Sequence, residues 1–313
     1  MKPIITVLEA IHSAGIERLS KFADVRVALG ADRNEILKLV SRSDCIIIKS
    51  VIQVDKELLD HAEKLQIVGR AGTGIDNIDI EESSKKNIKI LTVPEGNSVT
   101  AAEFTILKIL MLCRRVPEVM QYVSNKDFRR HNLEGRELKK MVIGLVGLGN
   151  VGMGVAERLQ PFGCKLFGWD PSPANKERFI SLGGHYVDSF DEMLPKIDIL
   201  SFHARLTPES YQMMDEFQFS IIKDGLYLIN CARANLINNK ALLVAIDAGK
   251  VKAAALDVLD PEPPFDLRPN EHSYDHNLLN HPKIIVTPHI GASTVDAQKR
   301  IALDLADQIK KSF

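Results

Sequence analysis

The stretch that most constrains the fold runs from Met141 to Asp170 and reads MVIGLVGLGNVGMGVAERLQPFGCKLFGWD. A short apolar run enters a turn that contains three glycines, and a helical pattern leaves that turn. A second apolar run, from Lys165 to Trp169, then ends on an acidic residue. This order is typical of a βαβ unit that binds a dinucleotide. A glycine-rich turn in an ordinary α/β domain is the alternative interpretation.

Each glycine of the turn has a physical role in dinucleotide binding. Gly147 permits the tight turn, Gly149 lets the backbone approach a pyrophosphate, and Gly152 lets the helix pack closely on the strand. The first turn of the helix offers unpaired N–H groups and a partial positive charge to the phosphates. We therefore expect the pyrophosphate of the cofactor at the start of this helix.

Asp170 indicates which nicotinamide cofactor is used. Its carboxylate can accept hydrogen bonds from the adenosine ribose hydroxyls, and it repels a 2′-phosphate. The next residues, Pro171, Ser172 and Pro173, include no Arg that would bind such a phosphate. NAD is therefore favoured over NADP.

Length and composition limit the class of protein. The 313 residues are enough for two domains with their own cores. The net charge of -1, from 40 basic and 41 acidic residues, gives no support for a nucleic-acid partner. No apolar run approaches the ~18 residues of a membrane span, and the N-terminus enters a strand-like pattern without a signal peptide. We expect a soluble cytoplasmic protein.

The cysteines are widely separated in the sequence, and each lies beside apolar residues. This arrangement favours buried free thiols in a reducing compartment over disulfides or a metal site. The residues concerned are Cys45, Cys113, Cys164 and Cys231.

The first hundred residues alternate between strand-like and helix-like segments, which predicts βαβ crossovers and a parallel sheet. The expected strands are Ile4–Leu8, Val25–Ala28, Cys45–Lys49, Gln66–Arg70 and Lys89–Leu91. The expected helices are Ile11–Phe22, Asn34–Val40, Lys56–Ala62 and Ile80–Lys86. A small doubly wound domain therefore precedes the glycine turn.

The segment from Ser98 to Val123 is apolar-rich and predicts one long helix, interrupted only by Pro117. Ser98 or Thr100 can cap it, and Glu103 completes a capping box with Thr100. The helix could link two domains, and its apolar side chains could serve an internal core or a subunit interface. The polar stretch 124–140 is a second candidate for such contacts.

After Asp170 the alternation resumes. Strands are expected at Ile197–Phe202, Leu226–Cys231, Ala253–Leu256 and Ile284–Thr287, with a weaker one at His185–Val187. Helices are expected at Ala174–Leu182, Pro208–Phe217, Lys240–Ala248 and Thr294–Lys311, and a Pro-rich loop at 260–282. We expect the last helix to return to the first domain.

The pattern as a whole predicts two doubly wound parallel-sheet α/β domains. Residues 1–98 together with 291–313 are expected to form a flavodoxin-like, substrate-binding domain. Residues 99–290 are expected to form a Rossmann domain that binds NAD.

Three charged residues follow expected strands at the sheet edge where ligands bind in such folds. An Arg, here Arg233, can hold a carboxylate and polarise a carbonyl. A His, here His289, can take a hydroxyl proton as hydride leaves. A Glu, here Glu262, can fix the imidazole ring and favour its protonated form. This combination suits dehydrogenation of a 2-hydroxy acid. Taken singly, Arg233 and Glu262 could be surface charges, and His289 a capping or packing residue.

Five sequence blocks, spread over essentially the whole chain, resemble the D-isomer-specific 2-hydroxyacid dehydrogenases. They are VGRAGTGIDNID (68–79), GLGNVG (147–152), INCARANL (229–236), AALDVLDPEPP (254–264) and VTPHIGAST (286–294). Within that family they look most like the phosphoglycerate dehydrogenases. The late position of the glycine turn supports the same branch, because L-specific lactate and malate dehydrogenases carry theirs at the start of the chain.

The resemblance implies a role for individual residues. Arg233 would bind the substrate carboxylate and carbonyl, His289 would be the acid/base and Glu262 its partner. Asp257 would lie near the nicotinamide carboxamide, and the domains would close over the substrate. The expected cofactor-binding residues are Gly147, Gly149, Asn150, Val151, Gly152, Asp170, Ala204, Cys231 and Asp257. The expected substrate-binding residues are Lys49, Arg70, Ala71, Gly72, Thr73, Gly74 and Asn97.

Some positions depart from the family pattern. The family usually has His-x-Pro where this chain has His203, Ala204 and Arg205; Arg205 could reach an acidic group of the ligand or lie in solvent. The two glycines usual after the catalytic Arg are Ala234 and Asn235. Lys49 stands where the phosphoglycerate enzymes tend to have Arg, and with Arg70 it could meet a substrate phosphate.

The resemblance implies NAD-dependent turnover of a D-2-hydroxy acid and its 2-keto acid. The expected pair is 3-phosphoglycerate and 3-phosphohydroxypyruvate, as in serine biosynthesis, by a homodimer with its interface within 98–140. A hydroxypyruvate or glyoxylate reductase, or an enzyme for another acidic 2-hydroxy acid, is the alternative. A corepressor-type NAD-sensing protein is the alternative of another class.

Two further expectations are negative. The chain ends at Phe313 soon after the returning helix, so no appended regulatory domain and no serine feedback are expected. His272, His276 and His281 are clustered in the Pro-rich loop, but no regular element orients them, and no metal site is expected there.

Overall fold

The structure is a computed structural model that describes residues 2–265 and 267–313. Position 1, where the first expected domain starts, and position 266 in the expected Pro-rich loop lie outside the described residues. The chain divides into two compact units, one made of residues 1–100 and 292–313 and the other of residues 101–291. Each unit contains one sheet, and every strand pairing described is parallel. The predicted fold class is confirmed.

Unit 1 (1–100 and 292–313) is built on a five-stranded sheet with the order β2-β1-β3-β4-β5. This is the flavodoxin-like doubly wound order. Its strands are β1 (Ile4–Val7), β2 (Asp24–Val27), β3 (Cys45–Ile48), β4 (Ile67–Arg70) and β5 (Lys89–Leu91). Its helices are α1 (Ser13–Ser20), α2 (Arg33–Val40), α3 (Lys56–Asp60), α4 (Ile80–Lys85) and α12 (Val295–Ser312).

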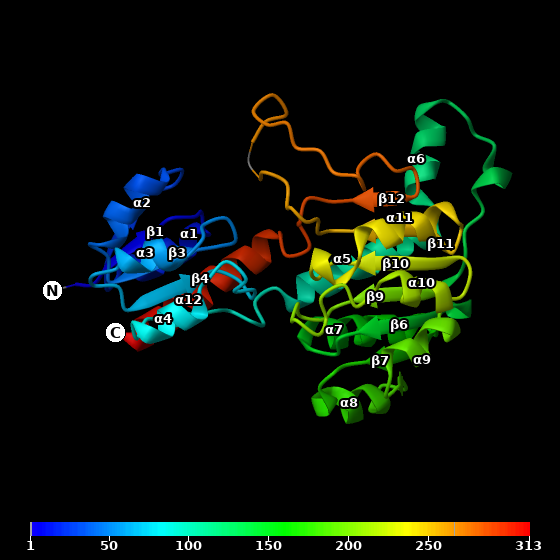
Figure 1. Cartoon of the computed structure of the whole chain (residues 1–313), viewed down its shortest axis with the longest axis horizontal. Coiled ribbons are helices and arrows are strands. Elements are labelled where there is room, and N and C mark those ends of the chain that lie inside the picture. Colours follow the sequence, from blue (N-terminus) through cyan, green and yellow to red (C-terminus); the bar gives the residue numbers. More distant parts are fainter. Residues whose placement is uncertain (1, 266) are drawn as a thin grey trace. The chain divides into compact units, whose positions relative to one another are not determined.

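The central strand β3 shows how unit 1 is packed. Cys45 and Ile47 face a core shared with α1 and α12, whereas Ile46 and Ile48 face a core shared with α2 and α3. Successive side chains of a strand point to opposite faces, so a strand buried on both faces is apolar throughout. The returning helix α12 therefore belongs to the first sheet, as the sequence predicts (Figure 1).

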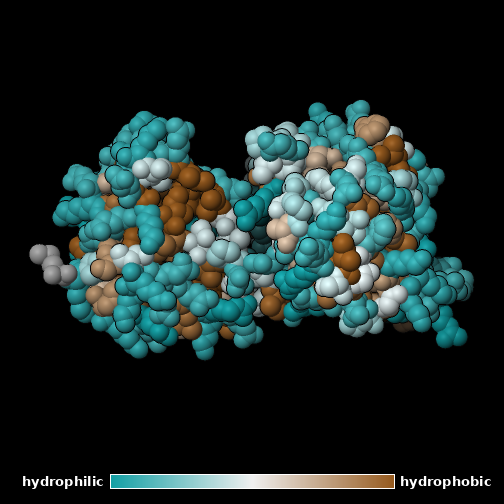
Figure 2. All heavy atoms as spheres, turned by 90° about the horizontal axis from the view of Figure 1, so that it is seen from below, coloured by the Kyte–Doolittle hydropathy of each residue, from teal (hydrophilic) through white to brown (hydrophobic). Residues whose placement is uncertain are grey.

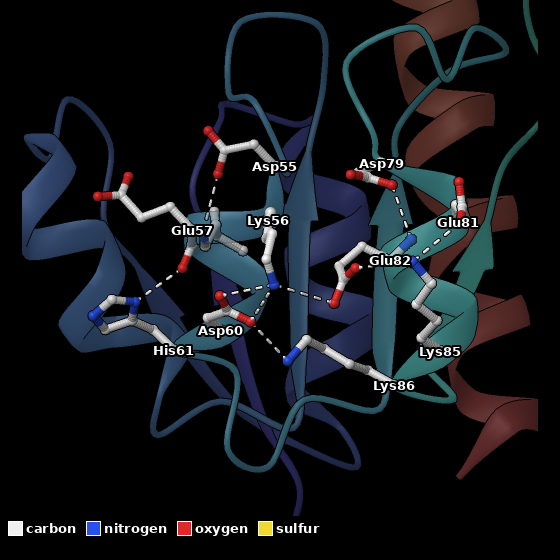
Figure 3. A network of polar contacts seen from close by, with 11 residues as sticks. Asp55, Lys56, Glu57, Asp60, His61, Asp79, Glu81, Glu82, Lys85 and Lys86 are labelled. Carbon is white, nitrogen blue, oxygen red and sulfur yellow. Dashed lines mark hydrogen bonds and ion pairs between the residues drawn. The ribbon is translucent and has the colours of Figure 1, made fainter.

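Aspartates and ion pairs organise the surface of unit 1 around α3 and α4. Asp55 and Asp79 cap these helices by accepting from the backbone N–H groups of Leu58 and Glu82. Figure 3 shows Lys56, Asp60, Glu82, Lys85 and Lys86 as a network that joins the two helices. Exposed pairs of this kind each contribute about 0–1 kcal/mol, so the network is a minor support for the fold.

Unit 2 (101–291) is built on a seven-stranded sheet with the order β12-β11-β10-β9-β6-β7-β8. Counted from its own first strand this is the Rossmann order with a seventh strand added at one edge. Its strands are β6 (Val142–Val146), β7 (Lys165–Trp169), β8 (His185–Tyr186), β9 (Ile199–Phe202), β10 (Leu226–Asn230), β11 (Val251–Leu256) and β12 (Ile284–Val286).

Helices cover both faces of the second sheet (Figure 1). The α-helices are α5 (Ser98–Cys113), α6 (Val116–Ser124), α7 (Asn150–Leu159), α8 (Lys176–Ser181), α9 (Phe190–Met193), α10 (Glu216–Ile221) and α11 (Asn239–Asp247). The short 3₁₀ helices are η1 (Arg130–Leu133), η2 (Leu138–Lys140), η3 (Gln160–Phe162), η4 (Pro173–Asn175), η5 (Leu194–Lys196) and η6 (Ala234–Leu236).

The single long helix expected from Ser98 to Val123 is two helices, so that prediction was wrong. The break lies at Arg115, which has a φ of 52° and precedes α6. Pro117 occupies the first turn of α6, where its missing N–H is tolerated, because in a helix interior it would clash with the preceding turn. The expected capping box is also wrong, since α5 begins at Ser98 and Thr100 lies inside it.

The helix expected at Pro208–Phe217 was wrong as well. Residues 207–211 form a turn held by Thr207 and Ser210, and the helix α10 starts only at Glu216. Asp215 caps it in a capping box with Gln218, a signal that the apolar spacing had obscured. The short helix α9 was not predicted.

The surface and the thiols agree with a folded α/β protein. Figure 2 shows a mainly hydrophilic face with separate hydrophobic patches. All four cysteines are free; Cys45 and Cys113 are buried, but Cys164 and Cys231 are half-buried rather than buried as predicted. In the part of the chain that the structure describes, none of the helices is long and apolar enough to cross a membrane.

Candidate functional site

Six strand ends of the second sheet form one register row. Pairing aligns Trp169, Val146, Phe202, Asn230, Leu256 and Val286 across the sheet. The chain leaves each strand at this carboxyl edge, where open parallel sheets bind ligands. The residues that follow directly are Asp170, Gly147, His203, Cys231, Asp257 and Thr287. Most of the residues predicted for the cofactor and the chemistry therefore lie along one edge.

The three glycines of the turn meet different constraints. Gly147 has a φ of 89°, and a Cβ there would lie 2.6 Å from the Ala204 nitrogen. A Cβ at Gly152 would lie 1.9 Å from the Gly147 carbonyl oxygen. A Cβ at Gly149 would meet no described atom within 4 Å. The protein's own packing thus requires Gly147 and Gly152, whereas Gly149 leaves space on the outside of the turn.

The start of α7 presents its backbone to that space. Gly149 is the N-cap residue, and no side chain caps the helix. First-turn N–H groups left in this state form an anion site with the helix dipole. The arrangement fits a pyrophosphate, because a phosphate oxygen can approach both the glycine backbone and these N–H groups.

Asp170 helps to shape the turn as well as facing the cofactor region. Its Oδ2 accepts from the Leu148 N–H at 2.6 Å, and its Oδ1 accepts from the Ser172 N–H at 2.8 Å. A carboxylate has about four acceptor positions, so ribose hydroxyls can still be bound. The Tyr186 hydroxyl donates to the Asp170 carbonyl at 2.9 Å and fixes the backbone there.

His203 lies where the strand order of the sheet reverses, between β6 and β9. Its N–H donates to the Val146 carbonyl at 2.7 Å, and its ring Nε2 is 3.0 Å from the Ser201 hydroxyl. Burial lowers the pKa of His203 to about 3, so the ring is neutral at physiological pH. His203 packs against Gly147 and Gly152 of the glycine turn and does not act as a cation.

His289 and Glu262 form the most informative side-chain pair. His289 Nδ1 lies 2.6 Å from Glu262 Oε1, and about a third of each side chain is exposed. The hydrogen bond expected from the sequence is therefore present, and Nε2 is the ring nitrogen left to face a ligand. His289 has a φ of 52°, which is uncommon for a residue with a side chain and often marks a functional position.

Asp257 builds the turn that carries His289. Its buried carboxylate accepts from the Thr287 hydroxyl, from the Ile290 N–H at 3.1 Å and from the Gly291 N–H at 2.7 Å. The Asp257 carbonyl accepts from the His289 N–H at 2.8 Å. The nicotinamide contact implied for Asp257 stays a prediction, and the structure adds a second role for this side chain.

The loop after β10 carries Arg233 and is organised by Asn230. The buried Asn230 side chain accepts from the Ala232 N–H at 2.9 Å and donates to the Arg233 carbonyl at 2.8 Å. Asn235, which replaces a family glycine, donates to Asp260 at 3.0 Å. This bond ties the loop of Arg233 to the loop that leads to Glu262.

The predicted substrate loop of unit 1 also requires a glycine. Gly72 has a φ of 152°, and a Cβ there would lie 1.6 Å from an Arg70 guanidinium nitrogen. The Ala71 N–H donates to the Ile48 carbonyl at 2.8 Å. The Thr73 hydroxyl donates to the Asn97 side chain at 2.9 Å. Residues 70–74 and Asn97 are therefore brought together, as predicted for one binding loop.

Lys49 begins a loop that is held from two sides. The Glu9 carboxylate accepts from the N–H groups of Lys49, Val51 and Ile52 at 2.7, 3.1 and 3.2 Å. The Asn77 side chain donates to the Lys49 and Ile52 carbonyls at 3.1 and 2.6 Å. The backbone under Lys49 is thus fixed, which suits a residue that meets a ligand.

The histidines of the Pro-rich loop have local roles. The Nδ1 atoms of His272, His276 and His281 accept from the backbone N–H groups of Tyr274, Leu278 and Lys283 respectively. Among the described residues, no group of three or more His, Cys, Asp or Glu is placed to hold a metal ion. Arg205 is exposed, so both interpretations of it remain open.

Sequence reasoning missed the residues that position the site. Asn230, Glu9 and Asn77 each directly bond the backbone of a loop that carries a predicted site residue. A polar residue at the end of a buried strand, as at Asn230, was the available signal. Glu9 had no comparable signal, because an acidic residue after a strand is ordinary.

A family comparison matches this part of the chain. Residues 106–291 match the model described as "D-isomer specific 2-hydroxyacid dehydrogenase, NAD binding domain". The match includes the glycine turn and ends just after His289.

Named relatives extend the likeness to the first unit. D-3-phosphoglycerate dehydrogenase of Methanocaldococcus jannaschii is 35% identical over 307 residues, which are 98% of this chain and 57% of that protein. The human protein of the same name is 35% identical over 282 residues, which are 89% of this chain and 51% of that protein. The chain spans about half the length of the curated relatives that it matches.

A solved structure shows a similar whole chain. D-lactate dehydrogenase from Aquifex aeolicus, complexed with NAD and lactic acid, superposes with a TM-score of 0.88 at 26% identity. The match covers 99% of this chain and 95% of that chain.

Proposed function

The chain belongs to the D-isomer-specific 2-hydroxyacid dehydrogenase family, and we propose that it interconverts a D-2-hydroxy acid and its 2-keto acid with NAD. The observation that carries this proposal is the His289–Glu262 pair, at 2.6 Å, on the sheet edge that also holds the glycine turn. An acid/base group on the same sheet edge as a dinucleotide-binding turn is what a hydroxyl-to-carbonyl conversion needs.

NAD, when bound, accepts hydride from the hydroxy acid, and NADH returns it to the keto acid. The backbone from Gly147 to Gly152 and the first turn of α7 would hold the pyrophosphate, because these groups are uncapped and Gly149 leaves room. Asp170 would bind the adenosine ribose. Ala204, Cys231 and Asp257 would line the rest of the cofactor site.

His289 Nε2 would take the hydroxyl proton during oxidation and return a proton during reduction. Glu262 accepts from Nδ1–H, which fixes the tautomer and favours the imidazolium that forms. Arg233 would bind the carboxylate and polarise the carbonyl, since a guanidinium holds a carboxylate bidentately. In unit 1, the backbone of residues 71–74 would bind substrate.

We propose a phosphorylated substrate, with 3-phosphoglycerate and 3-phosphohydroxypyruvate as the pair. Lys49, directly after β3, and Arg70, the last residue of β4, supply two cations at the ends of neighbouring strands. The names of the relatives from Methanocaldococcus jannaschii and human support the same substrate. Hydroxypyruvate or glyoxylate is the alternative, because a lysine in place of arginine is a less specific phosphate ligand.

A panel of 2-keto acids tests the proposal. NADH oxidation is measured with phosphohydroxypyruvate, hydroxypyruvate, glyoxylate and pyruvate, and phosphohydroxypyruvate should have the highest kcat/KM. If hydroxypyruvate is turned over equally well, the phosphate assignment fails. If no keto acid is turned over although NADH binds, a nucleotide-sensing role replaces the enzymatic one.

We propose that the protein is a cytoplasmic homodimer. The four free thiols suit a reducing compartment. On and after α6, Met120, Val123 and Phe128 are 67, 52 and 73% exposed, and exposed apolar groups of this kind mark interfaces. Light scattering on the purified protein tests the state, and a monomer at micromolar concentration would reject it.

A further inference from the structure

Helix α5 buries one charged side chain beneath the catalytic edge. The helix carries two charged residues, Glu103 and Lys108. Glu103 is exposed and lies 3.7 Å from Arg158. Lys108 is 1% exposed, in a helix whose other buried residues are mainly apolar. A buried ammonium is costly unless it is compensated, so its partners indicate its role.

The partners of Lys108 lie at the end of β11. Lys108 Nζ donates to the Leu256 carbonyl at 3.2 Å and lies 5.1 Å from the centre of the Phe104 ring. The Leu256 carbonyl also accepts from the Thr287 N–H at 3.0 Å. Lys108 therefore holds the backbone directly before Asp257, at the point where β12 is joined to the turn of His289.

The charged and titratable groups that face Lys108 are Asp257 and Cys231. Burial raises the pKa of the Cys231 thiol to about 12, so Cys231 is neutral at physiological pH. Burial lowers the pKa of Lys108, and interaction with Cys231 and Asp257 opposes that shift. The Asp257 carboxylate therefore favours the charged form of Lys108, while the Leu256 carbonyl is the group that Lys108 contacts directly.

Asp257 links the backbone that Lys108 contacts to the turn that carries His289. Its carboxylate accepts from Thr287, Ile290 and Gly291, which surround His289 in the sequence. Helix α5 touches the same turn a second time, because a Cβ at Gly291 would lie 3.5 Å from Phe104. Phe104 and Lys108 are one helical turn apart, so a single face of α5 supports the whole turn.

We propose that Lys108 is a positioning residue for His289, which it holds through Asp257 and the 287–291 turn. The inference rests on the proposed function for the role of His289. The structural link from Lys108 to the turn can be measured without turnover. Lys108 does not touch the substrate in this account.

The test compares Lys108→Met with Ile109→Ala. Met keeps the length and apolar stem of Lys and removes the charge, while Ile109 is a fully buried apolar residue of the same helix. Amide hydrogen exchange is followed in the peptide that contains Ile290 and Gly291. In Lys108→Met these amides should exchange about 10-fold faster, because the backbone next to the carboxylate that they bond has lost its contact with Lys108. Ile109→Ala should leave their exchange unchanged relative to global unfolding.

Steady-state kinetics provide the second readout. Lys108→Met should lower kcat by about 10-fold to 100-fold through misplacement of His289. The Kd for NADH should change less than kcat, because the pyrophosphate and ribose contacts proposed for residues 147–152 and Asp170 do not involve Lys108. Unchanged exchange in Lys108→Met, or an equal increase in Ile109→Ala, would overturn the inference. If the unaltered protein turns over no keto acid, the proposed function is rejected, but the amide hydrogen exchange still tests the link from Lys108 to the 287–291 turn.

Failure of Lys108→Met to fold is also informative. The double variant Lys108→Met/Asp257→Asn removes both buried charges. If the two compensate each other, it should recover folded protein relative to Lys108→Met, because mutations of coupled residues are not additive. No recovery would contradict the pairing of Lys108 with Asp257.

Discussion

The two edges of the seven-stranded sheet use charged residues in opposite ways. At the amino edge, Asp198 is 6% exposed and bonds the Val142 N–H at 2.9 Å and Lys223 Nζ at 2.6 Å. At the carboxyl edge, His289 and Glu262 bond each other but keep about a third of their side chains exposed. Asp198 therefore supports the fold at the amino edge, whereas the His289–Glu262 pair at the carboxyl edge stays accessible to a ligand.

Positive φ values occur at both edges; at the amino edge Gly225 and Gly249, which precede β10 and β11, adopt them without a side chain. Gly147 and His289, both at the carboxyl edge, have positive φ values of 89° and 52°. His289 carries a side chain, so its positive φ costs free energy, and such conformations are often kept at functional positions. Substitutions at His289 and Glu262 should therefore mainly lower kcat, whereas substitution of Asp198 should mainly lower the free energy of unfolding.

The largest effect is expected at His289. His289→Asn should lower kcat by about 10³-fold, because the acid/base group is lost, with little change in NADH affinity. Asn tolerates a positive φ better than Ala does, so His289→Ala serves as a comparison for the backbone. Both variants should lose turnover equally, and His289→Ala should melt at the lower temperature. Parallel loss of NADH binding would mean that His289 is structural.

A smaller loss is expected at Glu262. Glu262→Gln keeps the shape of the side chain but removes the negative charge beside the imidazolium. We expect kcat to fall about 10-fold to 100-fold, with the melting temperature unchanged because the pair is partly exposed. A lower melting temperature without a change in kcat would mean that Glu262, like Asp198, supports the fold and not the chemistry.

The amino edge should show the reverse. Although burial alone would raise the pKa of Asp198, the Lys223 ammonium and the Val142 N–H hold it below its usual range. Its contribution to stability is therefore present above about pH 4, where the unfolded group ionises, and is lost as pH falls through the lower folded value. Asp198→Asn should lower the free energy of unfolding by about 1–3 kcal/mol at neutral pH, with kcat unchanged.

Denaturant unfolding of Asp198→Asn at a series of pH values checks this. The difference in the free energy of unfolding between Asp198→Asn and the unaltered protein should become smaller as the pH is lowered into the acid range. A difference that is constant with pH, or a fall in kcat, would weaken the contrast between the two edges.

The smallest effect separates two glycines within the carboxyl edge. Gly149→Ala meets no described atom within 4 Å and should leave the melting temperature near that of the unaltered protein. It should weaken NADH binding about 10-fold, because the methyl group occupies the pyrophosphate approach. Gly152→Ala, with its Cβ 1.9 Å from a carbonyl oxygen, should lower stability as well. Titration of protein fluorescence with NADH measures binding by both variants, and thermal melting measures their stability. Equal losses of stability in Gly149→Ala and Gly152→Ala would contradict this separation.

Much of this edge was predictable from sequence because its signals are local. Each predicted motif can be recognised from a few neighbouring residues. This holds for the glycine turn, for Asp170 and for the segments around Arg233, Glu262 and His289. Strand and helix periodicity then placed them at the ends of parallel strands. The two parallel-sheet units and the return of the last helix followed from the alternation of elements.

The remainder depended on contacts between distant segments. Lys108 reads as an exposed charge on an amphipathic helix, and only its packing against residues 256 and 257 shows that it is buried. The Asn235–Asp260 bond joins residues that are separated by 25 positions. The helix break at Arg115 was missed because Pro117 was read as a kink, whereas it starts a new helix.

The central claim is that the carboxyl edge transfers hydride between NAD and a 2-hydroxy acid. It is tested most directly by single-turnover mixing of the protein and NADH with phosphohydroxypyruvate, using NADH with either hydrogen or deuterium at the transferred position. The absorbance of the reduced nicotinamide should fall only when the keto acid is present, and it should fall more slowly with deuterium. Bound NADH whose absorbance does not change with any 2-keto acid would contradict it.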